Sequence, residues 1–151
     1  MTTKAVTEAE ATEQWLTLYI DNDAYGIDVS LVQEVLNVPY ITPVPGAPDY
    51  VIGIINLRGN IITVLDARKR FGLPAKQFNQ DSQIIILRAG GQTHGILVDR
   101  VSEVIELQVD RIDPASDAGV GSAKKHIRGV YSAGGYLLVL INTDCLVTQE
   151  T

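Results

Sequence analysis

The chain carries GIDVSLVQEVL at residues 26–36 and GILVDRVSEVI at residues 95–105. Six of the eleven aligned positions are identical, at a constant offset of 69 residues. Four of these matches are aliphatic and therefore common in an apolar sequence, but the shared glycine and the shared glutamate, Glu34 and Glu103, are more specific. An internal repeat of this kind is the strongest architectural signal in the sequence.

A second pair of segments extends the repeat. Residues 53–66 align with residues 129–142, with glycine matching glycine at two positions and an apolar run at the same place in both. Because the order is the same in both halves, we expect two related subdomains, about residues 15–78 and 82–151. Each is small for an independent core, so the repeat predicts two related β barrels that share an apolar interface. Exchange of strands between the barrels stays open.

Outside the first fourteen residues, short apolar runs alternate with turn residues, which is typical of an all-β barrel or sandwich. Tight turns such as Gly59–Asn60 fit a hairpin because glycine readily adopts the positive φ that these turns need. In the most continuous apolar runs, Val64 and Val139 should be buried. We expect hairpins over residues 16–27, 54–65, 84–98 and 130–141.

Helical spacing occurs in two places. Val29, Val32 and Val35 recur at intervals of three, which predicts a short crossover helix or turn. Asn142–Asp144 can cap a helix near the C-terminus. The predicted fold class is therefore mainly β, with two packed barrels, short helices, and a flexible tail over residues 1–14.

Composition narrows the range of functions. The 151 residues suffice for one compact domain, and 46% hydrophobic with 20% charged residues is an ordinary globular mixture. A formal net charge of -6 repels phosphate backbones and anionic lipid on average, so nucleic acid is not an expected partner. No apolar run reaches the length of a signal peptide or membrane span, so we expect no direct membrane insertion. The single cysteine, Cys145, fits a reducing cytoplasm.

The sequence offers no catalytic constellation. His94, His126 and Cys145 lack the spacing of a metal site or a nucleophile pair, so both histidines are expected at the surface or in turns. No phosphate-binding loop or dinucleotide fingerprint is present, and neither a metal nor a cofactor is expected.

Two acidic pairs keep one enzymatic alternative open. Asp28 with Glu34, and Asp99 with Glu103, can in principle flank a glycosidic bond, as in a carbohydrate-acting β-barrel enzyme. The glutamates recur at equivalent positions of the repeat, which favours a structural role such as capping the crossover. We therefore expect a protein that is not an enzyme.

Arg58 is a candidate for contact with a partner. It lies within residues 56–60, between two predicted strands, where its planar guanidinium can donate hydrogen bonds to a partner's carboxylate or carbonyl groups. From the residues alone, a solvated arginine beside a turn is the favoured interpretation. Gly53 and Gly59 permit the close approach of another backbone.

At these residues the sequence resembles the CheW family of bacterial chemotaxis coupling proteins. The resemblance runs in order from Trp15 to about Val147 and implies a pair of five-stranded β barrels. The segment 114–125 departs from the family, and its role stays open. The matching motifs are AYGIDV at 24–29, VQEV at 32–35, VIGIINLRG at 51–59, IITVLD at 61–66 and GILVDRV at 95–101.

The resemblance also implies a function. Members of the family join the kinase CheA to chemoreceptors, in arrays at the cytoplasmic face of the membrane, without catalysing a reaction. The implied partners are the signalling tip of the receptors and the regulatory domain of CheA. The same fold occurs within CheA and CheV, but this chain has no room for their kinase or receiver domains. The family's receptor-binding region falls on Val32, Glu34, Asn56, Arg58 and Gly59, while kinase-binding residues are not assigned.

Overall fold

The computed structural model describes residues 11–74, 76–114, 126–133 and 135–147, most of which lie in β-strands. The predicted mainly β fold class is confirmed. The strands are β1 (Thr12–Ile20), β2 (Asp23–Asp28), β3 (Val32–Asn37), β4 (Val51–Leu57), β5 (Asn60–Asp66), β6 (Gln83–Ala89), β7 (Gln92–Val98), β8 (Arg100–Gln108), β9 (Ile112–Pro114), β10 (Ile127–Ala133) and β11 (Tyr136–Ile141). The helical elements are the 3-10 turns η2 (Val29–Leu31) and η3 (Val109–Arg111) and the α-helices α1 (Ala67–Arg70) and α3 (Thr143–Val147).

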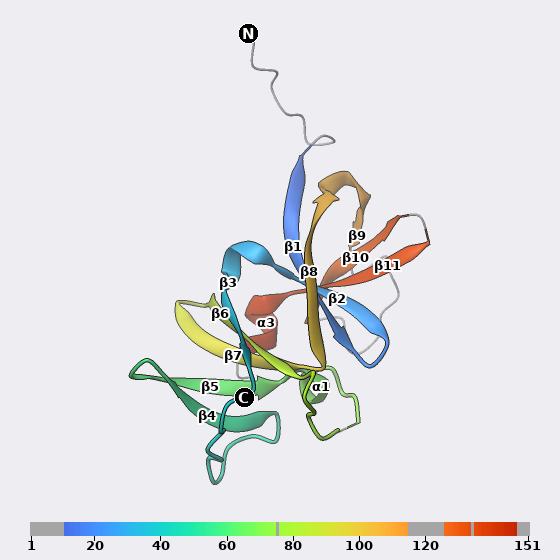
Figure 1. Ribbon diagram of the computed structural model, residues 1–151. Helices are drawn as coiled ribbons and strands as arrows, with labels where there is room; N and C mark the ends of the chain where they lie inside the picture. The colour runs from blue at the N-terminus through green and yellow to red at the C-terminus, as the bar shows by residue number, and fades with distance from the viewer. Residues whose placement is uncertain (1–10, 75, 115–125, 134, 148–151) are drawn as a thin grey trace.

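The described strands form two sheets, ordered β8-β1-β2-β11-β10-β9 and β3-β6-β7-β5-β4. In the first sheet the two edges are consecutive in the chain, because β8 runs through η3 into β9. In the second, the chain beyond β3 returns at Thr42 and forms an antiparallel bridge to Ile54 of β4. Each sheet therefore closes on itself. We call the first sheet barrel A and the second barrel B; the two pack side by side with α1 and α3 near their junction (Figure 1).

Strand exchange between the two halves of the sequence, which the repeat left open, is present. Barrel B consists of β3–β7, whereas barrel A combines the N-terminal hairpin β1–β2 with β8–β11. β1 pairs with β8, and β2 pairs in parallel with β11. The sheets thus cross the boundary that was expected between residues 78 and 82.

The repeated segments 26–36 and 95–105 are the two crossings between the barrels. One leads from β2 through η2 into β3, and the other leads from β7 into β8. Of the predicted crossover helix or turn, the structure has the turn, η2, because the chain from Val32 onward pairs with β6 as a strand. The burial of equivalent valines in the two segments matches only in part. Val35 is partly buried, whereas its counterpart Val104 is exposed.

Gly53 and Gly129 accept the segment that closes each barrel. A Cβ on Gly53 would collide with the carbonyl oxygen of Thr42, and one on Gly129 with that of Asp113. A bulge precedes both glycines, in β4 and in β10. The closing segments read Ile-Thr-Pro at residues 41–43 and Ile-Asp-Pro at 112–114, a third repeated element that is too short to recognise before the contact is seen.

Among the described residues, buried apolar side chains form three clusters: one inside each barrel and one between them. β6 serves two clusters, because Ile84 and Ile86 point into barrel B while Ile85 and Leu87 face the other barrel. Its continuous apolar run is thus that of a strand buried on both faces. This confirms the predicted apolar interface between related barrels.

The burial prediction holds for Val64, which is fully buried inside barrel B. It is wrong for Val139, which is only partly buried and packs against the cluster between the barrels. Leu138 and Leu140 of the same strand fill the interior of barrel A instead. At the constant offset of the second repeat, Leu140 is the counterpart of Val64.

The predicted helix near the C-terminus is confirmed as α3, and its first turn is capped by Asn142, whose side-chain oxygen accepts the N–H of Cys145 at 3.3 Å. Of the predicted tail, residues 1–10 lie outside the described part of the chain, and residues 12–14 belong to β1. Residues 115–125 of the unusual loop also lie outside it. No helix among the described residues is long and apolar enough to cross a membrane.

Replacing either closing glycine with alanine should destabilise the protein by about 1–3 kcal/mol, because the new methyl group meets backbone that cannot move aside easily. The costs of Gly53→Ala and Gly129→Ala should add in the double variant, since the two sites lie in different barrels. Urea unfolding of the three variants measures this. A loss confined to one site would show that the two barrels do not close in the same way.

Candidate functional site

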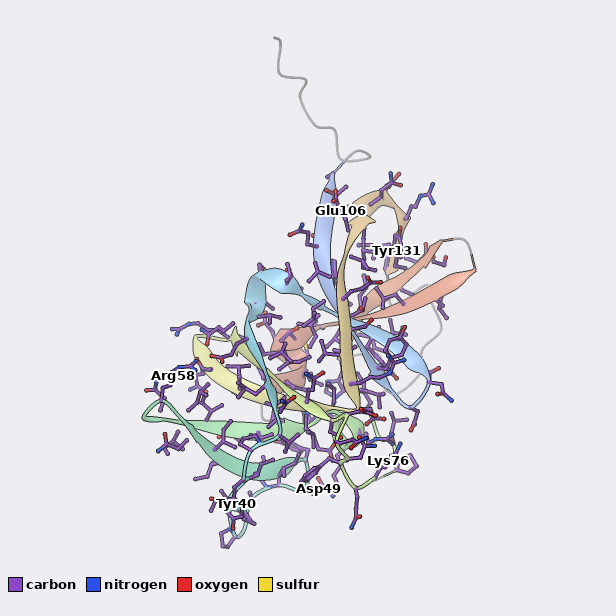
Figure 2. All side chains as sticks on the ribbon, viewed as in Figure 1. Tyr40, Asp49, Arg58, Lys76, Glu106 and Tyr131 are labelled. Atoms are coloured by element: carbon purple, nitrogen blue, oxygen red, sulfur yellow. The ribbon has the colours of Figure 1, made fainter. Side chains whose placement is uncertain are left out.

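The hairpin β4–β5 presents Arg58 at its tip. Leu57 pairs with Asn60, so the two-residue turn consists of Arg58 and Gly59, one position earlier than the sequence predicted. Their φ angles are 51° and 89°, as in a type I′ turn. The N–H of Gly59 donates to the side-chain oxygen of Asn56 at 2.9 Å, which fixes the turn. The side chain of Arg58 consequently projects from the hairpin, 68% exposed (Figure 2).

Glu34 of β3 is the partner of this arginine. The guanidinium Nη2 of Arg58 donates to Oε2 of Glu34 and forms an ion pair. The pairing of β3 with β6 shifts register at Gln33, so Glu34 reaches the surface while Val32 packs against the cluster between the barrels. The structure therefore brings together four of the five residues named from the resemblance and places Val32 beneath the surface.

The ion pair borders an open hollow of about 470 Å³ at one end of barrel B. Ile61, 64% exposed, also lines it. A second hollow of about 360 Å³ extends toward α3 and is lined by Tyr50 and Val147 among others. The two hollows share three lining residues, so they form one surface along β5 and β7: Thr63, Gln92 and His94.

The sequence does not predict that Ile61 and His94 belong to the site. Ile61 belongs to an apolar run that looks the same as a core strand, and its exposure follows from the hairpin geometry alone. His94 was expected at the surface or in a turn, but it lies in β7 and is partly buried. His126 is also not a surface residue: it is buried, with the ring of Phe71 edge-on at 6.1 Å.

The acidic pairs do not meet as catalytic pairs would. Asp28 caps η2 by accepting the N–H and the hydroxyl of Ser30, which is a structural role of the kind expected. Glu34 is bound to Arg58, and Asp99 to Arg68. Within the described ranges, no group of histidine, cysteine and acidic residues is arranged to hold a metal ion.

Arg68 of α1 is the buried cation of an ionic cluster, with partly exposed carboxylates, that the sequence does not predict. Its side chain is 7% exposed, and its Nε and Nη2 donate to both carboxylate oxygens of Asp99 at 3.1 and 2.7 Å. Nη2 also donates to Asp21, and Nη1 to the carbonyl oxygen of Pro74. Asp21 lies in the β1–β2 turn and Asp99 between β7 and β8, so the cluster joins the two barrels.

Comparison with known proteins decides the family. The family model for the CheW-like domain matches residues 14–151. This chain belongs to the CheW-like domain family. It is 31% identical over 138 residues to a chemotaxis protein CheW of Klebsiella aerogenes, covering 91% of this chain and 83% of that one. It is 30% identical over 148 residues to the CheW of Thermotoga maritima, covering 98% and 96%.

A solved structure agrees with the CheW assignment. The scaffolding protein TtCheW of Thermoanaerobacter tengcongensis superposes with a TM-score of 0.84 at 33% identity, covering 90% of this chain and 92% of that one. The resemblance to CheW is confirmed. The named relatives are chemotaxis and scaffolding proteins, so the prediction of a scaffold rather than a carbohydrate-acting enzyme is confirmed as well.

In the Arg68 cluster of this CheW-like chain, the cation and the carboxylates stabilise each other's charged forms. Hydrogen bonds to Asp99 and Asp21 raise the pKa of Arg68 further above its usual value, despite the opposing effect of burial. Burial by itself would raise the pKa of Asp99. Hydrogen bonds from Arg68 and from the backbone N–H of Asp21 outweigh it and hold the pKa of Asp99 below its usual range.

Arg68→Met should cost about 1.5–3 kcal/mol of folding free energy, because it removes the charge-assisted hydrogen bonds to Asp99 and Asp21, whose side chains are themselves 23% and 48% exposed. Arg58→Met is the matched control: it also removes one ion-paired guanidinium, but from an exposed pair worth about 0–1 kcal/mol. Both losses can be measured by urea unfolding at pH 7. Equal, small losses would mean that the cluster does not hold the barrels together.

The same cluster should make stability depend on acid pH. Because the pKa of Asp99 is lower in the folded than in the unfolded state, the unfolded state binds more protons as the pH falls. The stabilisation by Asp99 is complete above the unfolded pKa of about 3.9 and is lost as the pH falls through the folded value. Unfolding of the wild type and Asp99→Asn between pH 6 and pH 2 should show a flatter profile in the variant; parallel profiles would contradict this.

Proposed function

We propose that this protein couples chemoreceptors to the histidine kinase CheA, as a non-enzymatic adaptor in arrays at the cytoplasmic face of the membrane. The observation that carries the proposal is the exposed guanidinium of Arg58 at a hydrogen-bonded turn, beside an open hollow, in a chain of the CheW-like family. Chemotaxis and scaffolding names among the relatives support the same role.

The receptor-binding site in this proposal is the surface around Glu34, Asn56, Arg58 and Gly59. Val32, also in β3, anchors this strand by packing against the buried cluster between the barrels. An exposed ion pair such as Arg58–Glu34 contributes little to stability, so the guanidinium can exchange Glu34 for a partner's carboxylate at small cost. The turn already holds the arginine backbone in its conformation, which lowers the entropy lost on binding. The exposed Ile61 next to it offers an apolar contact.

The second partner in the proposal, the regulatory domain of CheA, binds at a different surface. An adaptor that holds two partners at once needs separate sites for them, and the Arg58 surface belongs to barrel B. Neither partner is a nucleic acid in this proposal, in keeping with the net charge of -6. The kinase-contact residues are not assigned.

Arg58→Glu should lower affinity for a receptor signalling fragment by tenfold or more, which corresponds to about 1.4 kcal/mol per decade. The variant loses a charge-assisted hydrogen bond and places like charge beside Glu34. Affinity for the CheA regulatory domain should change far less. Isothermal titration of both partners, with unfolding measured in parallel, tests this.

The matched control is Arg128→Glu, which reverses another partly exposed arginine that is ion-paired, to Glu13 in barrel A. It should leave receptor affinity unchanged. The double variant Glu34→Arg/Arg58→Glu restores the internal ion pair in reversed order, so it should be stable and still bind receptor poorly. Unchanged receptor affinity in Arg58→Glu would remove Arg58 from the site, and equal losses toward both partners with lowered stability would make its role structural.

A further inference from the structure

His94 lies where the two hollows of the Arg58 surface meet. On β7 it pairs with Thr63 of β5 on one side and with Leu87 of β6 on the other. It lines both hollows and is partly buried, so any partner segment that runs from Arg58 toward α3 passes over its ring.

The surroundings of His94 disfavour the charged imidazolium. Burial alone lowers the pKa of His94, with no carboxylate in the described chain acting to raise it. Its neighbours in the sheet, Thr63 and Leu87, are neutral. The ring is already partly shielded from water and has no counter-ion. If a partner removes more of the remaining water, the charged imidazolium becomes still less stable relative to the neutral imidazole.

The charged groups on the elements around His94 do not change this balance. From β6, the exposed Arg88 is a cation, which does not stabilise a second positive charge. At the end of the first hollow, the one carboxylate that lines it among the described residues, Glu34, is already paired with Arg58. Beyond the second hollow, the guanidinium of Arg70 lies 4.3 Å from the ring centre of Tyr50 and donates to backbone carbonyls of α3. Asp144 of α3 is exposed to solvent.

We infer that the receptor segment covers the ring of His94 with an apolar face. The protein then binds the receptor segment only when the imidazole of His94 is neutral. At acid pH, binding therefore releases the proton that the imidazole carries in the free protein. This inference rests on the proposed function, because it concerns the pH dependence and the partner selectivity of the same receptor-binding surface. A receptor segment with an acidic group for Arg58 and an apolar side chain that packs on the exposed Ile61 and reaches over His94 matches this hollow, whose other lining residues are mostly polar.

The direction of the pH effect follows from the proton balance. The complex binds fewer protons at His94 than the free protein does, so affinity rises with pH and levels off above the pKa of the free protein. Below that pKa, affinity falls by up to tenfold for each pH unit. The ordinary histidine value of about 6.5, lowered by burial, places the fall below pH 6.5.

The test is a titration with a receptor signalling fragment between pH 5.0 and 8.0, using the wild type and His94→Gln. Glutamine is neutral at every pH and of similar size, while His126 and all carboxylates remain in both proteins. Affinity of the wild type should fall from pH 8.0 to pH 5.0 by at least twofold more than that of His94→Gln. His94→Val should be as insensitive to pH as the glutamine variant.

Two further measurements separate the possible failures. The pKa of the His94 imidazole, followed by NMR, should drop when the receptor fragment binds and stay constant when the CheA regulatory domain binds. Equal pH profiles for wild type and His94→Gln, tighter binding in acid, or an unchanged His94 pKa in the receptor complex would each overturn the inference. If the receptor fragment fails to bind at pH 8.0, where the imidazole is neutral in all states, the proposed function itself is wrong.

Discussion

The buried guanidinium of Arg68 holds the two barrels in one arrangement. It binds the β1–β2 turn through Asp21 and the β7–β8 connection through Asp99, although these residues lie 47 and 31 positions away in the chain. Asp99 also accepts the N–H of Asp21, which has a positive φ of 56°, so the cluster fixes backbone as well as side chains. A buried cation with this many partners leaves little freedom for the barrels to shift against each other.

The short helix α1 extends this connection to α3, which also lies near the junction of the barrels. Arg70, two residues after Arg68, donates to the carbonyl oxygens of Leu146 and Cys145 at 2.8 and 3.0 Å, in the last turn of α3. A cation that donates to carbonyl oxygens at the end of a helix stabilises them. The position of α3, and with it one wall of the surface near Val147, therefore depends on the same four-residue helix.

Local patterns predicted the hairpins well, because turn residues and alternating burial act over a few residues. The spacing of Val29, Val32 and Val35 predicted a helix or turn, and only the turn η2 forms, for a physical reason. The bulge at Gln33 inserts one residue, so Val32 and Val35 point to the same cluster although they are three apart. A bulged strand thus imitates helical spacing, and only the pairing with β6 distinguishes them.

The residues of the Arg58 surface could be predicted from the sequence, but their contacts could not. The resemblance named Arg58 and Glu34, but their contact depends on the turn at Arg58–Gly59 and on the bulge, neither of which is visible in the sequence. The cluster around Arg68 could not be predicted, since its members share no motif and come from three distant segments.

The exchange of strands sets the order in which the barrels can be completed during synthesis. Barrel B is one uninterrupted segment and has all its strands once the ribosome has passed β7. The hairpin β1–β2 is made first, yet both its edges stay unpaired until β8 and β11 arrive, as the pairing of Tyr25 with Val139 shows. Such distant pairings slow folding. The hairpin β1–β2 therefore precedes barrel B in synthesis but completes its own sheet only after it.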